Sequence, residues 1–368
     1  MRVKIGDVTK IRTGKLDANA SSEEGQYPFF TCSREPLRIS TYSYDCECVL
    51  VAGNGDLNVK YYNGKFDAYQ RTYIIEDNSG GKLYMPYLYY FMEGYIEELR
   101  KQAIGGVIKY IKLGNLTNAL IELPSIHKQR AIVDILEKIR NVIAMRNAEV
   151  NKLENLVRAR FVELFGDMFL NTMSWNEEPL EEMANVVSGI TKGRKLKAQC
   201  TTEVPYMAVS NVKDGYIDWT TVKTIEATEQ EINQYRLLPE DVLMTEGGDP
   251  DKLGRGAIIK EPLENCIHQN HIFRVRLNAT VILPEFFAEY LRHQKSKRYF
   301  LGCAKQTTGI ASINMRQLKA LPVLLPPLEL QNQFADFVKV VDKSKAVVQK
   351  ALDQTQQLFD SLMQEYFG

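Results

Sequence analysis

Two stretches of the chain carry apolar residues at alternating steps of four and three positions. The first series runs from Ile132 to Leu164 and the second from Phe334 to Tyr366, and eight of the ten positions in each are apolar. Neither stretch contains glycine or proline. A sustained repeat of 3.5 residues predicts long helices that pair along an apolar seam. At about 40 residues each and roughly 1.5 Å per residue, these helices would be on the order of 60 Å long.

Apolar seam positions would carry the pairing of the two helices. We expect these contacts from Ile132, Leu136, Ile139 and Ile143 in the first helix, and from Phe334, Val338, Val341 and Phe359 in the second. Two separate helices, each packed in its own globular core, would show a similar pattern. Pairing is the favoured interpretation because neither seam has another obvious partner.

The two helices belong to a longer internal repeat. Residues 111–166 and 313–368 align without a gap at an offset of 202. The matched pairs include Ile111 with Ile313, Leu123-Pro124 with Leu325-Pro326, Gln129 with Gln331, and Phe165-Gly166 with Phe367-Gly368. A repeat of this length predicts two related units with rough symmetry.

A weaker match opens each half of the chain. Ile5 and Gly14 correspond to Leu180 and Gly189 at an offset of 175. The middles, residues 26–75 and 203–276, show no alignment. Each half therefore has a shared start, a divergent middle and a shared finish, which suits two different recognition surfaces on one duplicated frame.

Composition favours a fold of the α+β class. The 368 residues suffice for two domains with cores of their own, and 19 tyrosines and 15 phenylalanines favour strands in the divergent middles. We predict two mixed domains, residues 1–110 and 167–312, separated by a helical spine formed by residues 111–166 and 313–368. Six cysteines occur without a Cys-x-x-Cys pair, and reduced thiols in the cytoplasm are the expectation.

Charge is balanced overall but unevenly distributed. The formal net charge is zero, which argues against a protein that binds polyanions with its whole surface. Three segments nevertheless contain basic residues and no acidic ones: residues 99–121, 186–202 and 290–328. Their recurrence in both halves suggests two electropositive faces, although ordinary solvated lysines would explain any single segment.

Polar residues beside turns are the candidates for reading a nucleic acid. Arginine and lysine suit guanine in the major groove, whereas asparagine and glutamine suit adenine. In the first half, Gln70 and Arg71 follow a glycine turn and precede a short strand, although a structural pair is an equally good explanation. The candidates in the second half are Lys192, Arg194, Lys195, Asn211, Lys213, Arg255, His268, Gln269, Asn270 and Lys305.

Signs of catalysis or of a cofactor are lacking in the sequence. No lysine follows an acidic residue at the spacing of a common nuclease motif, and no Gly-Lys is followed by Ser or Thr as in a P-loop. Cys266, His268 and His271 lie close in sequence, but zinc needs three or four converging ligands and no fourth occurs at a familiar spacing. We therefore predict no catalytic residue, no metal and no cofactor.

In combination, several motifs resemble those of the specificity subunit of type I restriction–modification enzymes. They are LPSIHKQR at residues 123–130, its partner LPPLELQN at 325–332, LFGD at 164–167, PLEE at 179–182 and VPYM at 204–207. The resemblance covers the whole chain. One departure is Leu330, where the family usually has a more polar residue.

This resemblance implies an architecture and a set of partners. The two helices would pair antiparallel and hold two recognition domains apart, related by a pseudo-twofold axis. Each domain would read one half of a bipartite target in double-stranded DNA, and the subunit itself would catalyse nothing. Two methyltransferase subunits, which bind S-adenosylmethionine and methylate adenine, would dock on the helices, with or without motor-nuclease subunits. The competing interpretation is a duplicated helical adaptor that binds proteins, and salt-dependent DNA binding would separate the two.

Overall fold

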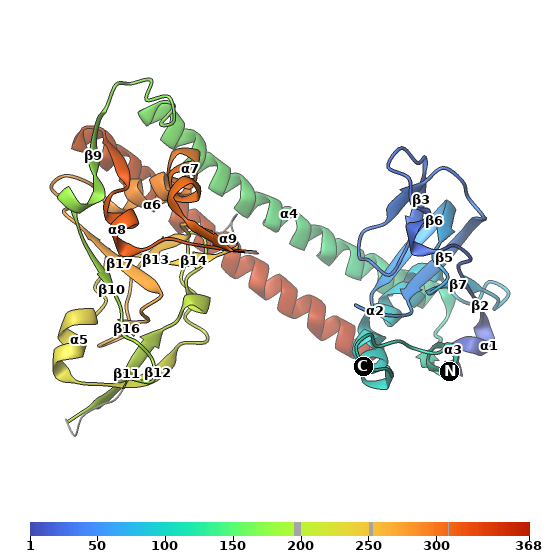
Figure 1. The fold of residues 1–368 in the computed structure, drawn as a ribbon. Coiled ribbons are helices and arrows are strands. Elements are labelled where there is room, and N and C mark those ends of the chain that lie inside the picture. Colours follow the sequence, from blue (N-terminus) through green and yellow to red (C-terminus); the bar gives the residue numbers. More distant parts are fainter. Residues whose placement is uncertain (195–199, 250–252, 308) are drawn as a thin grey trace. The chain divides into compact units, whose positions relative to one another are not determined.

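The computed structural model describes residues 1–194, 200–249, 253–307 and 309–368 (Figure 1). The chain divides into two compact units. Unit 1 is Met1–Ala148 with Val348–Gly368, and unit 2 is Glu149–Val347. Each of the long helices, α4 (Ile126–Phe165) and α9 (Leu328–Phe367), contributes one end to each unit. The compact units therefore differ from the domain boundaries predicted from the repeat, because the helix ends pack into both cores.

Unit 1 is built on a six-stranded sheet in the order β2-β7-β5-β6-β3-β4. All neighbouring strands are antiparallel except the pair β3 and β6. The elements are β2 (Thr9–Thr13), η1 (Ala18–Ala20), β3 (Tyr27–Phe30), β4 (Leu37–Ile39), β5 (Tyr44–Ala52), β6 (Val59–Ala68), β7 (Thr72–Asp77) and α2 (Met85–Gln102).

The central strand β5 is buried on both faces, which explains its uninterrupted apolar run. Val49 and Val51 point to the core that contains α2, whereas Cys48 and Leu50 point to a second cluster with Phe66. Alternate side chains of a strand face opposite sides of a sheet. Helix α2 therefore covers one face, and an aromatic cluster fills the other.

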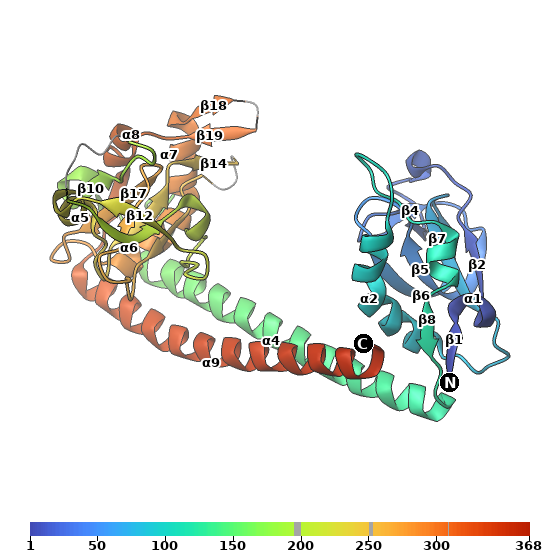
Figure 2. The same ribbon diagram turned by 90° about the horizontal axis from the view of Figure 1, so that it is seen from below.

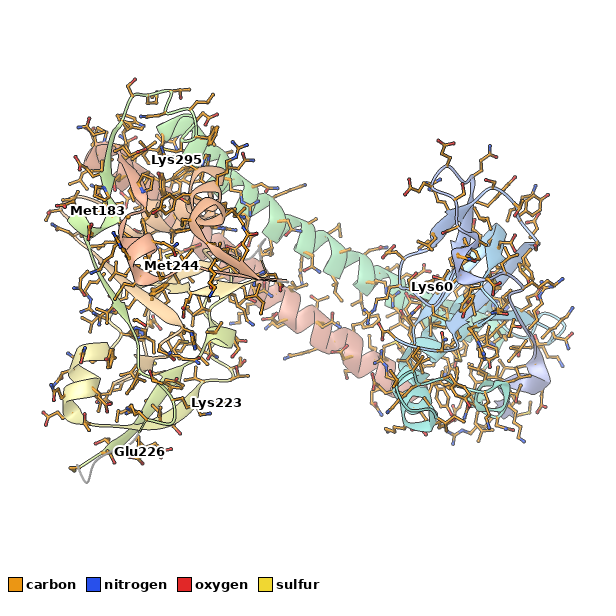
Figure 3. The ribbon with its side chains drawn as sticks, viewed as in Figure 1. Lys60, Met183, Lys223, Glu226, Met244 and Lys295 are labelled. Atoms are coloured by element: carbon orange, nitrogen blue, oxygen red, sulfur yellow. The ribbon has the colours of Figure 1, made fainter. Side chains whose placement is uncertain are left out.

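Besides the pair β9 and β20, the described strands of unit 2 form three small sheets, ordered β10-β17-β13-β15, β12-β11-β16 and β14-β19-β18. Its core includes Met183 and Met244, labelled in Figure 3, together with Phe161 and Phe165 of α4 and Phe334 of α9. The elements are β10 (Ala184–Ser188), β11 (Thr202–Met207), η3 (Val209–Asn211), β12 (Lys223–Ala227), α5 (Glu229–Tyr235), β13 (Val242–Thr245), β14 (Gly247–Gly248), β15 (Gly256–Ile258), β16 (Ile267–His268), β17 (Ile272–Leu277), α6 (Pro284–Arg292), α7 (Gln294–Cys303), β18 (Lys305–Thr307) and β19 (Ile310–Ser312).

The repeated start and finish of each half are hydrogen-bonded to one another. β1 (Arg2–Lys4) pairs antiparallel with β8 (Leu120–Glu122), and β9 (Asn176–Pro179) pairs in the same way with β20 (Pro322–Leu325). The remaining repeated elements are α1 (Ile5–Val8) and α3 (Leu113–Thr117) in unit 1, and η2 (Leu180–Glu182) and α8 (Met315–Lys319) in unit 2. In each unit, the weakly matched start and the strongly matched finish of the sequence thus form one structural frame.

Helices α4 and α9 lie side by side and antiparallel within each unit (Figures 1 and 2). In unit 1 the Arg140 guanidinium lies over the Phe359 ring, 5.5 Å from its centroid. In unit 2 the rings of Phe161 and Phe334 are 5.3 Å apart. All ten positions of each predicted seam are buried or half-buried. The prediction of paired helices is confirmed, and both helices have the predicted 40 residues.

Polar residues interrupt the seam without being left unpaired. Arg146 donates to Thr355 across the helix pair in unit 1, and Lys345 forms an ion pair with Glu154 in unit 2. Arg160, the remaining polar seam residue, pairs with Glu163 of its own helix and lies over the Phe337 ring of α9. A partner of this kind offsets the cost of desolvating a charge. The helix pair therefore tolerates polar residues at two of the ten seam positions in each helix.

Candidate nucleic-acid interface

A turn at one end of the strands has the same backbone frame in both units. We call residues 69–72 and 269–272 the recognition turns. Three backbone hydrogen bonds of 2.8 to 3.0 Å hold each of them. They run from Tyr69, Gln70 and Thr72 N to Phe30, Leu16 and Tyr69 O in unit 1, and from Gln269, Asn270 and Ile272 N to Met207, Ile190 and Gln269 O in unit 2. The two turns therefore correspond at an offset of 200, and the different side chains conceal this correspondence in the sequence.

The glycine that ends the repeated start of each half is required by this frame. A Cβ on Gly14 would lie 2.1 Å from Ala68 O, and one on Gly189 would lie 2.0 Å from His268 O. No side chain fits at these distances. Glycine is the residue that allows such a close approach of two backbones, so the match of these two positions in the sequence reflects the recognition turns.

Predicted site residues occupy equivalent positions in the two turns. Gln70 is exposed, and its Nε2 donates to Asp17 Oδ1 at 2.9 Å. Arg71 is exposed and forms no ion pair within the described ranges. The equivalent of Gln70 is Asn270, which is half-buried. Gln269 is half-buried as well, and its side-chain oxygen accepts from Val209 N at 3.3 Å.

Lysine and arginine side chains without an ion pair lie near both recognition turns. In unit 1, Lys15 N bonds Ala68 O at 3.1 Å, and Lys109 O accepts from Gly55 N at 3.0 Å, next to the loop that bonds Arg71. In unit 2 the corresponding cations are the exposed Lys192 and Lys305 and the half-buried Arg255, whose carbonyl accepts from Thr245 N next to Glu246. Within the part of the chain that the structure describes, none of these five side chains has a carboxylate within ion-pair distance. Their charge is therefore available to a polyanion.

Two predicted DNA-reading residues are buried against the surrounding backbone. His268 is 0% exposed, with its ring nitrogens 3.1 Å from Tyr235 O and 3.4 Å from Val187 O. Burial lowers the pKa of His268 to about 4, so the ring is neutral. Asn211, also 0% exposed, bonds the backbone of Ala208 and Asp218. The prediction that these two read bases is corrected, because neither can reach a ligand outside the core.

The loop after Gly189 is only partly available. Arg194 Nη2 donates to Glu231 Oε2 at 2.7 Å, and the bond from Arg194 lowers the pKa of Glu231 to about 2. This pairing engages Nε and Nη2 of Arg194 within the fold, and its contact with a nucleic acid stays a prediction. Lys195 lies outside the described residues. Lys213 is half-buried in the turn 213–216.

His271 and Glu246 are the residues that sequence reasoning missed. His271 Nδ1 lies 2.6 Å from Glu246 Oε2, and the two side chains are 56% and 32% exposed. The sequence suggested only one role for His271, that of a possible metal ligand. Among the described residues no three His, Cys, Asp or Glu side chains gather in a way that could hold a metal ion. An alignment of the divergent middles would have revealed His271 as the equivalent of Arg71, but the sequence contains no signal for it.

A family model described as the type I restriction modification DNA specificity domain matches residues 1–155 and 173–356. The chain belongs to this family. The specificity subunit of the type I restriction enzyme EcoDI from Escherichia coli is 36% identical over 156 residues, which is 42% of this chain and 34% of that protein. The MjaVIII specificity subunit from Methanocaldococcus jannaschii is 24% identical over 398 residues, covering 98% of this chain and 90% of that one.

Solved structures support the fold of the specificity family. The type I restriction–modification S subunit from M. genitalium superposes with a TM-score of 0.62 at 17% identity, covering 100% of this chain and 96% of that one. The chain spans less than half the length of the first curated relatives it matches, 34% of the EcoDI subunit and 45% of the MjaX subunit. None of the helices in the described ranges combines the length and apolar character that a membrane crossing requires.

Proposed function

We propose that this chain is a non-catalytic specificity subunit that reads double-stranded DNA in the cytoplasm. Each unit recognises one half of a bipartite target through its recognition turn. Two methyltransferase subunits dock on the paired helices, with or without motor-nuclease subunits. The observation that carries the proposal is the pair of recognition turns, which have one backbone frame but present different exposed side chains beside unpaired cations.

A shared frame with different side chains is what two half-sites of different sequence require. The backbone must approach each half-site in the same way, whereas the side chains must differ if the bases differ. Cations near the turns would contact phosphates, which position a protein on DNA, and polar side chains on the turns would contact base edges, which specify the sequence.

A binding experiment on the full chain tests the role of the cations. Duplex DNA of randomised sequence is titrated at several salt concentrations with the wild type and with Lys15→Ala/Lys109→Ala. Each lost phosphate contact should reduce the slope of log affinity against log salt by about 1, so the double variant should lose about 2. Lys4→Ala is the matched control. Lys4 is also exposed, but it precedes β2, whereas Lys15 follows that strand next to the recognition turn.

Exchange of segments tests whether each unit reads one half-site. Residues 1–110 of a relative replace those of this chain, and adenine methylation is mapped in a host that supplies the cognate methyltransferase. One half of the methylated motif should change, while the other half and the spacer length persist because both long helices are retained. The donor segment must preserve the pairing of β1 with β8, since the exchange separates those strands.

Two outcomes would contradict the proposal. Binding that is absent, or indifferent to salt, would favour a duplicated adaptor that binds proteins. A change in both half-sites after one exchange would mean that the units read DNA jointly.

A further inference from the structure

The third residue of each recognition turn is held by the same backbone hydrogen bonds in the two units but differs in chemistry. Arg71 O accepts from Gly53 N at 2.8 Å, and His271 O accepts from Glu246 N at 2.9 Å. The carbonyls of Gly53 and Glu246 in turn accept, each at 2.9 Å, from a matched pair of the repeat, Ile111 and Ile313. Residues 71 and 271 thus project from equivalent, pinned backbone positions, and both side chains are accessible.

In unit 1 this position presents hydrogen-bond donors only. A Cβ on Gly53 would lie 2.3 Å from Arg71 O, so no side chain can stand beside Arg71 at that point. The guanidinium has no carboxylate within ion-pair distance among the described residues. Arginine has no acceptor, and its natural partner in the major groove is guanine, through N7 and O6.

In unit 2 the residue equivalent to Gly53 is Glu246, and its carboxylate fixes the imidazole. An ionised carboxylate only accepts, so the 2.6 Å contact places the ring proton of His271 on Nδ1. Nε2 lies 3.5 Å from Asn270 Nδ2, which is a donor. In the neutral ring Nε2 is then the acceptor, and it faces the amide donor of Asn270.

We propose that residues 71 and 271 are the specificity-determining positions of the two units, an inference that rests on the proposed function. Arg71 donates to a guanine in one half-site. His271 Nε2 accepts from an exocyclic amino group, N6 of adenine or N4 of cytosine, in the other half-site. In that complex the base amino group takes the place of the Asn270 amide, and Glu246 is the positioning residue that sets the ring.

Selection from a pool of duplex DNA, randomised at every position, tests this assignment with the full chain. His271→Ala should lower the preference for an amino-bearing base at a single position of one half-site by about fivefold, the value of one hydrogen bond. The selected base then shows whether the partner is adenine or cytosine. Arg71→Ala should remove the preference for guanine at one position of the other half-site only.

Exchange of the local pair gives a gain of function that loss of folding cannot imitate. Glu246→Gly with His271→Arg places the Gly53 and Arg71 chemistry in unit 2, and should create a preference for guanine at the position that His271 reads. Glu246→Gln should keep the wild-type preference, because its amide oxygen still accepts from Nδ1, whereas Glu246→Ala should relax it. The matched control is Glu261→Ala. Glu261 is exposed and follows the end of β15 that pairs with the start of β13, whereas Glu246 follows the end of β13.

The outcomes separate this inference from the proposed function. A wild type that selects no motif refutes the proposed function and the inference with it. A wild type that selects a bipartite motif, which His271→Ala and the double variant leave unchanged, overturns the inference alone. If the double variant fails to fold, the comparison of Glu246→Gln with Glu246→Ala tests the inference instead. Equal selected motifs from these two variants would contradict the inference.

Discussion

A buried glutamine fastens the start of each long helix to the core of its own unit. Gln129 and Gln331 are both 0% exposed. Each accepts one backbone hydrogen bond and donates two. Their partners are Tyr84 N, Lys82 O and Pro124 O for Gln129, at 2.8 to 2.9 Å, and Leu283 N, Val281 O and Pro326 O for Gln331, at 2.8 to 3.2 Å. Tyr84 and Leu283 are the N-caps of α2 and α6, so each glutamine also binds the residue at which another helix of its unit begins.

Replacement of Gln331 by leucine should destabilise unit 2 strongly. The change leaves one backbone N–H and two carbonyls without their partner in a site that water does not reach. At about 1–3 kcal/mol for each unsatisfied buried group, the loss is at least about 3 kcal/mol. Gln331→Glu should be no milder, because a carboxylate would face two carbonyl oxygens. Gln333→Leu, at an exposed neighbouring position, should change the free energy of unfolding by no more than about 0.5 kcal/mol.

Hydrogen exchange measured separately for the two units is the appropriate assay. A chain with two compact units need not unfold in one step, so a single midpoint would not report the effect. Gln331→Leu should speed exchange at Leu283 and across unit 2 while unit 1 stays protected, and Gln129→Leu should show the reverse. Protection of Leu283 at the wild-type level in Gln331→Leu would refute the reasoning.

Three further changes address burial and charge. Leu136→Asp places a charge at a 0% exposed seam position and should unfold unit 1, whereas Ile135→Asp at an exposed neighbour should not; equal circular dichroism melts would contradict this. Because the unfolded chain binds the His268 proton first, the free energy of unfolding of unit 2 should fall by up to about 3 kcal/mol as the pH is lowered from 6.5 to 4. His268→Gln should flatten this pH dependence in denaturant titrations. Arg194→Ala should cost less than about 1 kcal/mol at neutral pH, and the difference from wild type should shrink as pH falls from 4.5 to 2, where Glu231 becomes protonated; a difference that is constant with pH would exclude the pair.

Local periodicity determined the two long helices of this protein. The 3.5-residue repeat identified both helices and a seam of buried or half-buried positions, because a helix buries residues at intervals that the chain itself displays. It did not identify Phe161 and Phe165, which pack against Phe334 of the facing helix. The ungapped match of residues 111–166 with 313–368 likewise predicted duplicated frames, and Gln129 and Gln331 make the same set of bonds in both. Gly14 and Gly189 matched because a close backbone approach excludes every other residue.

Only the tertiary structure decided which polar residues are accessible. His268 and Gln269 are neighbours in sequence, yet the first closes a strand inside the core and the second begins a recognition turn. Burial of His268 depends on Tyr235 and Val187, which are 33 and 81 positions away. A single sequence has no local signal for partners that distant.

The equivalence of Arg71 and His271 was also decided by the fold. Backbone hydrogen bonds hold the recognition turns, and such bonds do not depend on which side chain is attached. Selection for different ligands can therefore replace every exposed residue of a turn while the frame persists. The sequence by itself determined the duplicated helices and their seam, because burial there constrains side chains at short range. The correspondence of the two reading surfaces emerged only from long-range backbone pairing.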